Sequence, residues 1–203
     1  MRRPADVRYW RVKDLAEVEV MHADFRQRAS SRHVHEGYEM SIIQRGTMRL
    51  RHRGATYVAG PGDLIVINPD DPHAESNADA HGWTSYSIYP SIENLTGAAS
   101  EVLDGTGLPT FTSPVVRDHQ LVARIARMHR LLAISASLLT RESAAVEAAV
   151  ELVSRHALAV EAVVCQGQCR PSSTARENTS RVSTSETSPF SSSRSSRERA
   201  AFT

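Results

Sequence analysis

The chain has 203 residues, a length that suits one domain or at most two. Hydrophobic residues make up 40% of it and charged residues 23%, which is typical of globular proteins. The formal net charge of +1 excludes a strongly basic nucleic-acid coat and an acidic tail protein. No apolar run approaches the roughly 18 residues that a membrane-spanning helix needs, so we expect no membrane partner.

Two features of the sequence predict a cytoplasmic protein. Residues 1–6 are charged and lack the apolar stretch of a signal peptide. The only cysteines are Cys165 and Cys169, which are too few to staple a fold of this size. A reducing compartment is therefore the default expectation.

The composition changes at residue 165. The last 39 residues hold 11 Ser and 5 Thr, and such a segment buries too little apolar surface to offset the chain entropy lost on folding. We predict that residues 165–203 form a disordered Ser/Arg-rich tail. A second hypothesis is that the reading frame slips near Cys165, because a regular helical pattern stops abruptly there. Both interpretations remain open at this point.

Residues 7–113 contain short, β-rich segments separated by Gly, Pro and Asn. In these segments apolar residues alternate with polar ones or form a wholly apolar run: 15–21, 40–50, 55–59, 64–67 and 83–89. Many short strands at this spacing indicate an antiparallel sandwich or barrel. We place this β domain at residues 1–114.

From Asp118 onwards the apolar period changes from 2 to about 3.6, which predicts helices over residues 115–164. A first stripe is formed by Leu121, Ile125, Met128 and Leu132. Thr140 is the expected N-cap of a second helix over residues 140–164. That helix carries a coiled-coil-like seam: Val146, Val150, Val153, Ala157, Val160 and Val164. The helices could cover the open end of the barrel, form a dimer interface, or do both.

Four residues carry the most specific chemical signal. His33, His35 and Glu39 share parity, so an extended chain points them to one face, and His73 follows later in the chain. If that face is the barrel interior, three imidazoles and one carboxylate converge. Such a set suits a divalent metal, Fe, Mn, Ni or Zn, with positions left open for a ligand.

The spacing of these residues resembles a known superfamily. His33-x-His35-x3-Glu39-x6-Gly46 is similar to the first motif of the cupins, and Gly62-Asp63 through Pro69 to His73-x3-Asn77 is similar to the second. The interval from Pro69 to His73 is one residue shorter than in metal cupins and lacks their glycine. In this it resembles the N-terminal sensor domain of AraC-type transcription regulators. The resemblance covers roughly residues 15–164.

The resemblance implies a mostly β fold: a cupin-like antiparallel jelly-roll barrel followed by two α-helices. The barrel, residues 1–114, would bind a small effector, such as a sugar or another metabolite. The helical pair, residues 115–164, would form a homodimer, chiefly through the helix at 140–164. In the family a DNA-binding module with two helix-turn-helix units follows the helices. In this sequence it should begin just past residue 165. The tail has no apolar periodicity, so we expect no sequence-specific DNA binding from this chain alone, although the family binds DNA.

Several alternatives stay open. His33, His35, Glu39 and His73 either ligate a metal or form a polar cluster that hydrogen-bonds the effector. Tyr38, Trp83 and Tyr86 either line the effector pocket or are ordinary core aromatics. Three arginines lie on one strand face: Arg49, Arg51 and Arg53. They either recognise an anionic effector or form a solvated outer face. His52 is expected to point inward.

Two functional classes and a third, simpler possibility follow. The first is a ligand-sensing regulatory domain without its DNA-binding module, with no catalytic residue. The second is a small metal-dependent cupin enzyme of the dioxygenase or isomerase type. The shortened second motif counts against this reading, and so does the lack of a separate general base or nucleophile. The third is a folded but nonfunctional remnant of a regulator.

Overall fold

A computed structural model describes residues 6–13, 15, 18–100, 102, 107–134 and 137–159, all within a compact unit, Met1–Val164. The predictions for residues 165–203 therefore lie outside the described residues, as do Val160 and Val164. Among the helices in the described part, none is long and apolar enough to cross a membrane.

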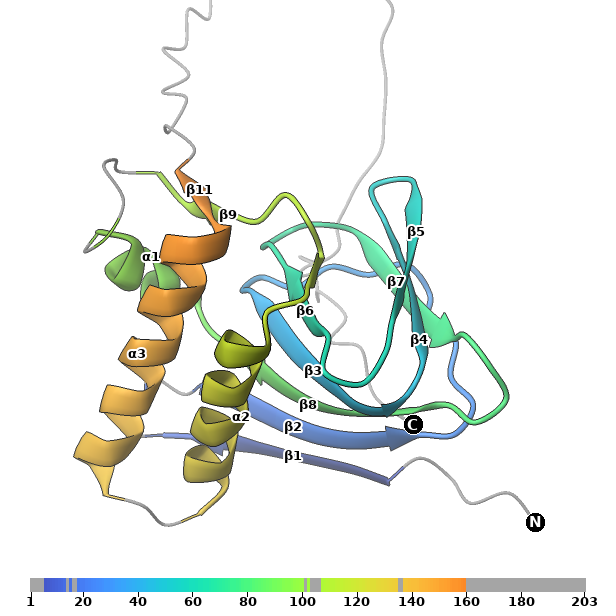
Figure 1. Ribbon diagram of the computed structural model, residues 1–203, viewed down its shortest axis with the longest axis horizontal. Coiled ribbons are helices and arrows are strands. Elements are labelled where there is room, and N and C mark those ends of the chain that lie inside the picture. Colours follow the sequence, from blue (N-terminus) through green and yellow to red (C-terminus); the bar gives the residue numbers. More distant parts are fainter. Residues whose placement is uncertain are drawn as a thin grey trace, which may run out of the picture. The chain divides into compact units, whose positions relative to one another are not determined.

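The described residues form antiparallel sheets and three helices (Figure 1). The larger sheet has the order β1 (Asp6–Val12), β2 (Val18–Phe25), β8 (Trp83–Tyr89), β3 (Glu39–Gly46), β6 (Leu64–Ile67) and β10 (Val115–Val116). The smaller has the order β5 (Ala55–Ala59), β4 (Met48–His52) and β7 (His73–Asn77), and β9 (Pro109–Thr110) pairs with β11 (Leu158–Ala159). The helices are α1 (Ile92–Ser100), α2 (His119–Ala133) and α3 (Leu138–His156). The predicted mostly β, jelly-roll class with two following helices is confirmed.

One hydrophobic core fills the barrel between the two sheets. Alternate side chains of each strand point into it, as a pleated strand requires. Ile43 of β3, Leu50 of β4 and Ile65 of β6 are fully buried there. The strands at 55–59, 64–67 and 83–89 have the bounds that the sequence predicts.

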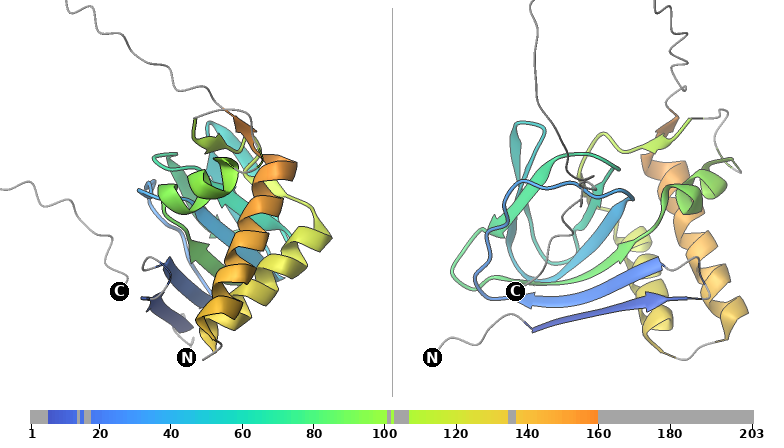
Figure 2. Two further views of the ribbon diagram at one scale, coloured as in Figure 1. Left: turned by 90° about the vertical axis from the view of Figure 1, so that its left-hand side faces the viewer. Right: turned by 180° about the vertical axis from the view of Figure 1, so that it is seen from behind.

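A second core lies on the outer face of the six-stranded sheet, beneath the helices. Met40 and Ile42 of β3 point into it, and the predicted stripe of α2 faces them: Leu121, Ile125, Met128 and Leu132. Figures 1 and 2 show α2 and α3 side by side against this sheet, with β4 and β5 on the far side of the barrel. The helices therefore cover a sheet face, and the expectation that they close the barrel's open end is wrong.

The second predicted helix differs in both its ends and its buried face. Its N-cap is Ser137, whose hydroxyl accepts a hydrogen bond from the Thr140 N–H at 3.2 Å, so Thr140 lies within the helix. The helix ends at His156, well before residue 164. Its buried side chains are Ala144, Ala148, Leu152 and Val153. Small alanines let α3 approach its neighbours closely, whereas Val146 of the predicted seam is 60% exposed.

The sequence prediction lacks several elements, among them β1, β7 and α1. β1 pairs with β2 along its whole length and forms one edge of the larger sheet. α1 contributes Leu95, Ala98 and Ala99 to the core beneath the helices. β10 pairs with β6, so the sheet continues past residue 114.

A glycine of the first motif has a purely structural task. Gly46 ends β3 with a φ of +72°, a conformation that favours glycine. A Cβ atom at this position would lie 1.9 Å from the carbonyl oxygen of Gly82. The motif glycine thus permits the close approach of two turns at the far end of the barrel from Glu39.

Candidate site: a histidine–carboxylate cluster inside the barrel

Five polar side chains gather at one end of the barrel interior, and we call them the histidine–carboxylate cluster: His33, His35, Glu39, His73 and Glu75. The potential ligand atoms of His33, His35 and His73 all lie within 4.8 Å of one another. The same limit holds for Glu39, His73 and Glu75. The four residues that the sequence singles out are therefore close together, and Glu75 joins them.

His33 reaches the cluster because its segment runs along the edge of β7. The backbone N–H of His33 donates to the His73 carbonyl at 2.9 Å, and the reverse bond is 3.0 Å long. Closer to the other end of β7, the N–H of Ser30 donates to the Glu75 carbonyl at 2.8 Å. Residues 28–33 thus extend the smaller sheet, and we call them the edge segment.

The shortened turn between Pro69 and His73 positions His35. Asp70 adopts a φ of +57°, and its N–H donates to the His35 carbonyl at 2.9 Å. The imidazole of His35 lies with its Nε2 atom 3.2 Å from Glu39 Oε2, and its ring packs against Tyr89. The turn that distinguishes this sequence from metal cupins therefore holds one of the predicted ligands.

Glu39 is the electrostatic centre of the cluster. It is 3% exposed, and the Ser41 hydroxyl donates to its Oε1 atom at 2.7 Å. Burial alone would raise the pKa of Glu39, but His35 and His73 outweigh burial and hold that pKa well below its usual range. Burial works to lower the pKa of His73, and the neighbouring Glu39 carboxylate raises it overall. Glu39 is therefore an anion that favours a positive charge beside it.

Two histidines of the cluster have the hydrogen bonding that metal ligands need. Nδ1 of His33 is 3.0 Å from the Ser31 carbonyl oxygen, and Nδ1 of His73 is 2.9 Å from that of Asp71. A carbonyl accepts only an N–H, so Nε2 is the remaining atom of each ring. Nε2 of His73 is buried without a hydrogen-bond partner, 3.4 Å from Glu39 Oε2. A proton or a metal cation between Nε2 of His73 and the Glu39 carboxylate would satisfy both atoms. Three imidazole nitrogens and a carboxylate oxygen are a set of donors that fits a divalent metal.

Sequence reasoning missed Glu75 and Tyr89. Glu75 follows His73 by two positions on the same strand, so it faces the same interior, and this parity is the signal that would have found it. Burial, followed by the charge of Glu39, raises the pKa of Glu75 to about 7. Burial also raises the pKa of Tyr89 well above its usual range.

The three predicted aromatic residues do not join the cluster. Tyr38 is buried outside the barrel, and its hydroxyl donates to the Pro109 carbonyl at 2.8 Å. Tyr86 faces the helices, where its ring stacks on His129 at 4.4 Å. Trp83 points into the barrel but lies at the other end of β8, packed on Phe25. The structure places the three rings apart from the cluster, because strand parity turns Tyr38 and Tyr86 to the opposite sheet face and Trp83 lies at the far end of β8.

The remaining candidates fall where the strand pattern predicts. Arg49, Arg51 and Arg53 are exposed, as an outer strand face requires. His52 points inward, is 3% exposed, and has its Nε2 atom 3.1 Å from Asp71 Oδ2.

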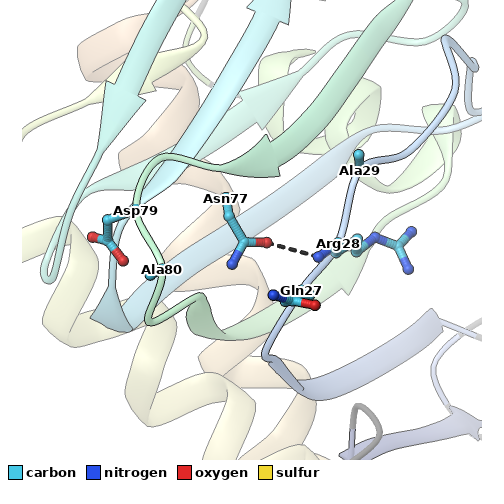
Figure 3. Close-up of a pocket in the computed structure, with 6 residues that line it drawn as sticks. All are labelled: Gln27, Arg28, Ala29, Asn77, Asp79 and Ala80. Atoms are coloured by element: carbon cyan, nitrogen blue, oxygen red, sulfur yellow. Dashed lines mark hydrogen bonds between the residues drawn. The ribbon is translucent and has the colours of Figure 1, made fainter. Parts of the chain in front are cut away.

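A surface hollow of about 340 Å³ lies where the edge segment meets the end of β7 (Figure 3). It is lined by Gln27, Arg28, Ala29, Asn77, Asp79 and Ala80. Asn77, the last residue of the second motif, accepts the backbone N–H of Arg28 at 2.7 Å. The Arg28 side chain lies with Nε 4.0 Å from Glu75 Oε2, so Arg28 contacts both the hollow and the cluster.

Comparison with known proteins identifies the family. The family model described as AraC-like ligand binding domain matches residues 15–154, more than half of the chain. This chain belongs to the family of AraC-like ligand binding domains. Over 126 residues it is 28% identical to YbfI of Bacillus subtilis (strain 168), an uncharacterized HTH-type transcriptional regulator. The match covers 61% of this chain and 45% of YbfI, so this AraC-like ligand binding domain aligns with less than half of its relative.

Solved structures with some likeness to this AraC-like ligand binding domain include a cupin superfamily protein and KdgF. A cupin superfamily protein from Desulfitobacterium hafniense DCB-2 has a TM-score of 0.37 at 14% identity, covering 44% of this chain and 81% of that one. KdgF from a Halomonas species has a TM-score of 0.37 at 16% identity, covering 42% of this chain and 78% of that one. The family assignment stands on the family match.

Proposed function

We propose that this chain is the effector-sensing domain of an AraC-type transcription regulator and that its effector binds at the histidine–carboxylate cluster. The observation that carries the proposal is the buried Nε2 atom of His73, which lacks a hydrogen-bond partner beside the anionic Glu39. Buried polar atoms are almost always paired, so this Nε2 atom, beside a carboxylate in the barrel interior, is available to bind a ligand. Because a transcription regulator acts on the chromosome, we place the protein in the cytoplasm.

The proposed role is sensing rather than catalysis. Glu39 is engaged by Ser41 and two histidines, which leaves it poorly placed to act as a general base. A metal-dependent dioxygenase or isomerase could use the same cluster. The cluster, however, supplies no separate general acid, general base or nucleophile for such a reaction. The family to which the chain belongs favours sensing as well.

His33, His35, Glu39 and His73 would hold a divalent metal such as Fe, Mn, Ni or Zn. When bound, the metal would supply a Lewis acid that anchors an oxygen atom of the effector. The protein's own contribution is to orient the imidazoles through the Ser31 and Asp71 carbonyls and to exclude bulk water by burial.

A homodimer through α3 completes the proposal. The face of α3 that turns away from the core exposes Leu139 by 73% and Val146 by 60%. Glu39 of β3 belongs to the histidine–carboxylate cluster, while Met40 and Ile42 of the same strand pack beneath the helices. Effector binding would therefore favour one packing of the helices on the sheet, through its differential affinity for two arrangements.

A thermal-shift panel tests the effector site. Chelator-treated protein is heated alone, with each divalent metal, and then with sugars and organic acids in the presence and absence of metal. We expect a ligand of the folded state to raise the Tm by several degrees. His33→Ala should abolish that rise, while His81→Ala, at an exposed loop position, should keep it. Equal shifts in both variants, or no shift from any compound, would refute the site.

A further inference from the structure

Glu75 lies in the cluster but outside the set of residues that the sequence motifs predict. The carboxylates of Glu75 and Glu39 and the imidazole of His73 form a second group of potential ligand atoms within 4.8 Å of one another. His73 belongs to both groups, and Glu39 is 3.2 Å from His35, so the two groups are continuous. The five side chains therefore surround one region of the barrel interior.

The charge balance of this region calls for a cation. Glu39 and Glu75 place two carboxylates close together in the interior, with side chains 4% and 11% exposed. Among the described residues near Glu75, Arg28 is the guanidinium within ion-pair range, at 4.0 Å, the outer limit of such a pair. Among these residues, Glu75 has an ion pair only at the outer distance limit, and a buried carboxylate in that position is costly. A divalent cation would offset its charge together with that of Glu39.

A second, independent observation points to a ligand at the same place. The Nε2 atom of His73 is directed at Glu39 and lacks a hydrogen-bond partner, although its side chain is completely buried. Its ring is held in that orientation by the Asp71 carbonyl. A lone pair fixed beside two carboxylates is an arrangement that a metal ion satisfies.

We propose that Glu75 is a further ligand of the cation centre, which then offers three imidazoles and two carboxylates. This inference rests on the metal site of the proposed function. Zinc sites in proteins use three or four protein ligands, while added carboxylate oxygen suits Mn²⁺. A five-donor set with two carboxylates therefore favours Mn²⁺ relative to a four-donor set of three histidines and one glutamate.

The test is a titration of the chelator-treated full chain with Mn²⁺, followed by the EPR signal of the free ion, and a parallel calorimetric titration with Zn²⁺. We expect Glu75→Gln to weaken Mn²⁺ binding at least tenfold and Zn²⁺ binding by a smaller factor. Glu142→Gln, on the exposed surface of α3, is the matched control and should bind both ions as the wild type does.

The Tm of the metal-free variant separates a ligand from a structural ion pair. If Glu75 is a ligand, Glu75→Gln removes a repulsion between carboxylates, so the metal-free Tm stays the same or rises. If Glu75 serves only to pair with Arg28, the metal-free Tm falls and Mn²⁺ affinity stays within twofold of wild type, which overturns the inference.

The two proposals fail in distinguishable ways. A wild type that binds Mn²⁺ with an affinity that Glu75→Gln leaves unchanged overturns the role of Glu75 alone. A wild type that binds neither ion overturns both the metal site and this inference, while sensing of a metal-free effector is judged by the thermal-shift panel.

Discussion

At the scale of single residues, His129 shows how a helix is locked to the sheet by a neutral imidazole. Its ring stacks on Tyr86 at 4.4 Å and meets the edge of Trp10, and its Nε2 atom lies 3.2 Å from the Met21 carbonyl oxygen. Burial lowers the pKa of His129 from 6.5 to about 4. The folded protein therefore keeps this histidine uncharged at pH values where the unfolded chain protonates it.

This difference predicts a loss of stability in acid. Above pH 6.5 neither state binds the proton, and as the pH falls towards 4 only the unfolded state does, so stability decreases through that window. We expect the contribution of His129 to fall by about 2 kcal/mol between pH 7 and pH 5, measured by urea unfolding.

His129→Phe is the variant that isolates the effect. It keeps a flat ring against Tyr86 and should lose less stability between the two pH values than wild type, by about 2 kcal/mol. His81→Phe removes an exposed histidine and is the matched control. A His129→Phe protein with the pH dependence of wild type would show that other groups govern the acid transition.

At the scale of elements, Asp118 joins the beginning of α2 to the end of α3. Its Oδ1 atom accepts the Leu121 N–H at 3.2 Å and so caps α2, while Oδ2 lies 2.9 Å from His156 Nε2 and 2.8 Å from Arg155. The side chain is 7% exposed. One carboxylate thus satisfies a helix terminus and holds two helices together.

Replacement of Asp118 separates these tasks. Asp118→Ala should lower the unfolding free energy by about 2 kcal/mol, because it removes a cap worth about 1 kcal/mol and leaves His156 and Arg155 without their partner. Asp118→Asn keeps a capping oxygen and should cost less. Ser137→Ala removes the cap of α3 and no ion pair, and chemical denaturation compares all three. Equal losses in Asp118→Ala and Ser137→Ala would contradict the linking role.

The exposed face of α3 predicts a dimer that one charge disrupts. We expect the wild type to sediment as a dimer and Val146→Glu to shift it to monomer with little change in Tm, because Val146 is 60% exposed. Val58→Glu, at a 49% exposed position on β5, should leave the dimer intact. A monomeric wild type, or a dimer that survives Val146→Glu, would exclude α3 as the interface.

At the scale of the whole molecule, the sequence predicts the interior better than the edges. The alternation in β4 correctly places Leu50 and His52 inside and Arg51 outside, because strand parity is a local property. The stripe of α2 is correct for the same reason. β1 and α1 are missed, and the end of α3 is misplaced, since these features depend on which surface the rest of the fold leaves to be covered.

The same division applies to the candidate site. The spacing of His33, His35, Glu39 and His73 predicts their convergence because each lies on or beside a strand of known parity. Tyr38 and Tyr86 are misplaced because their aromatic character alone does not tell which face of the sheet they occupy. Glu75 needs no tertiary information beyond the direction of His73, and was nonetheless missed.

The edge segment has a mechanical consequence. His33 lies in the edge segment, which is hydrogen-bonded to the edge of the smaller sheet, whereas His73 and Glu39 belong to strands of the two sheets. Any molecule that binds His33 and His73 at once therefore links the edge segment to β7. The slow exchange of backbone amide hydrogens at Ser30 and His33 would then report occupancy of the barrel, even for a ligand without colour or spin.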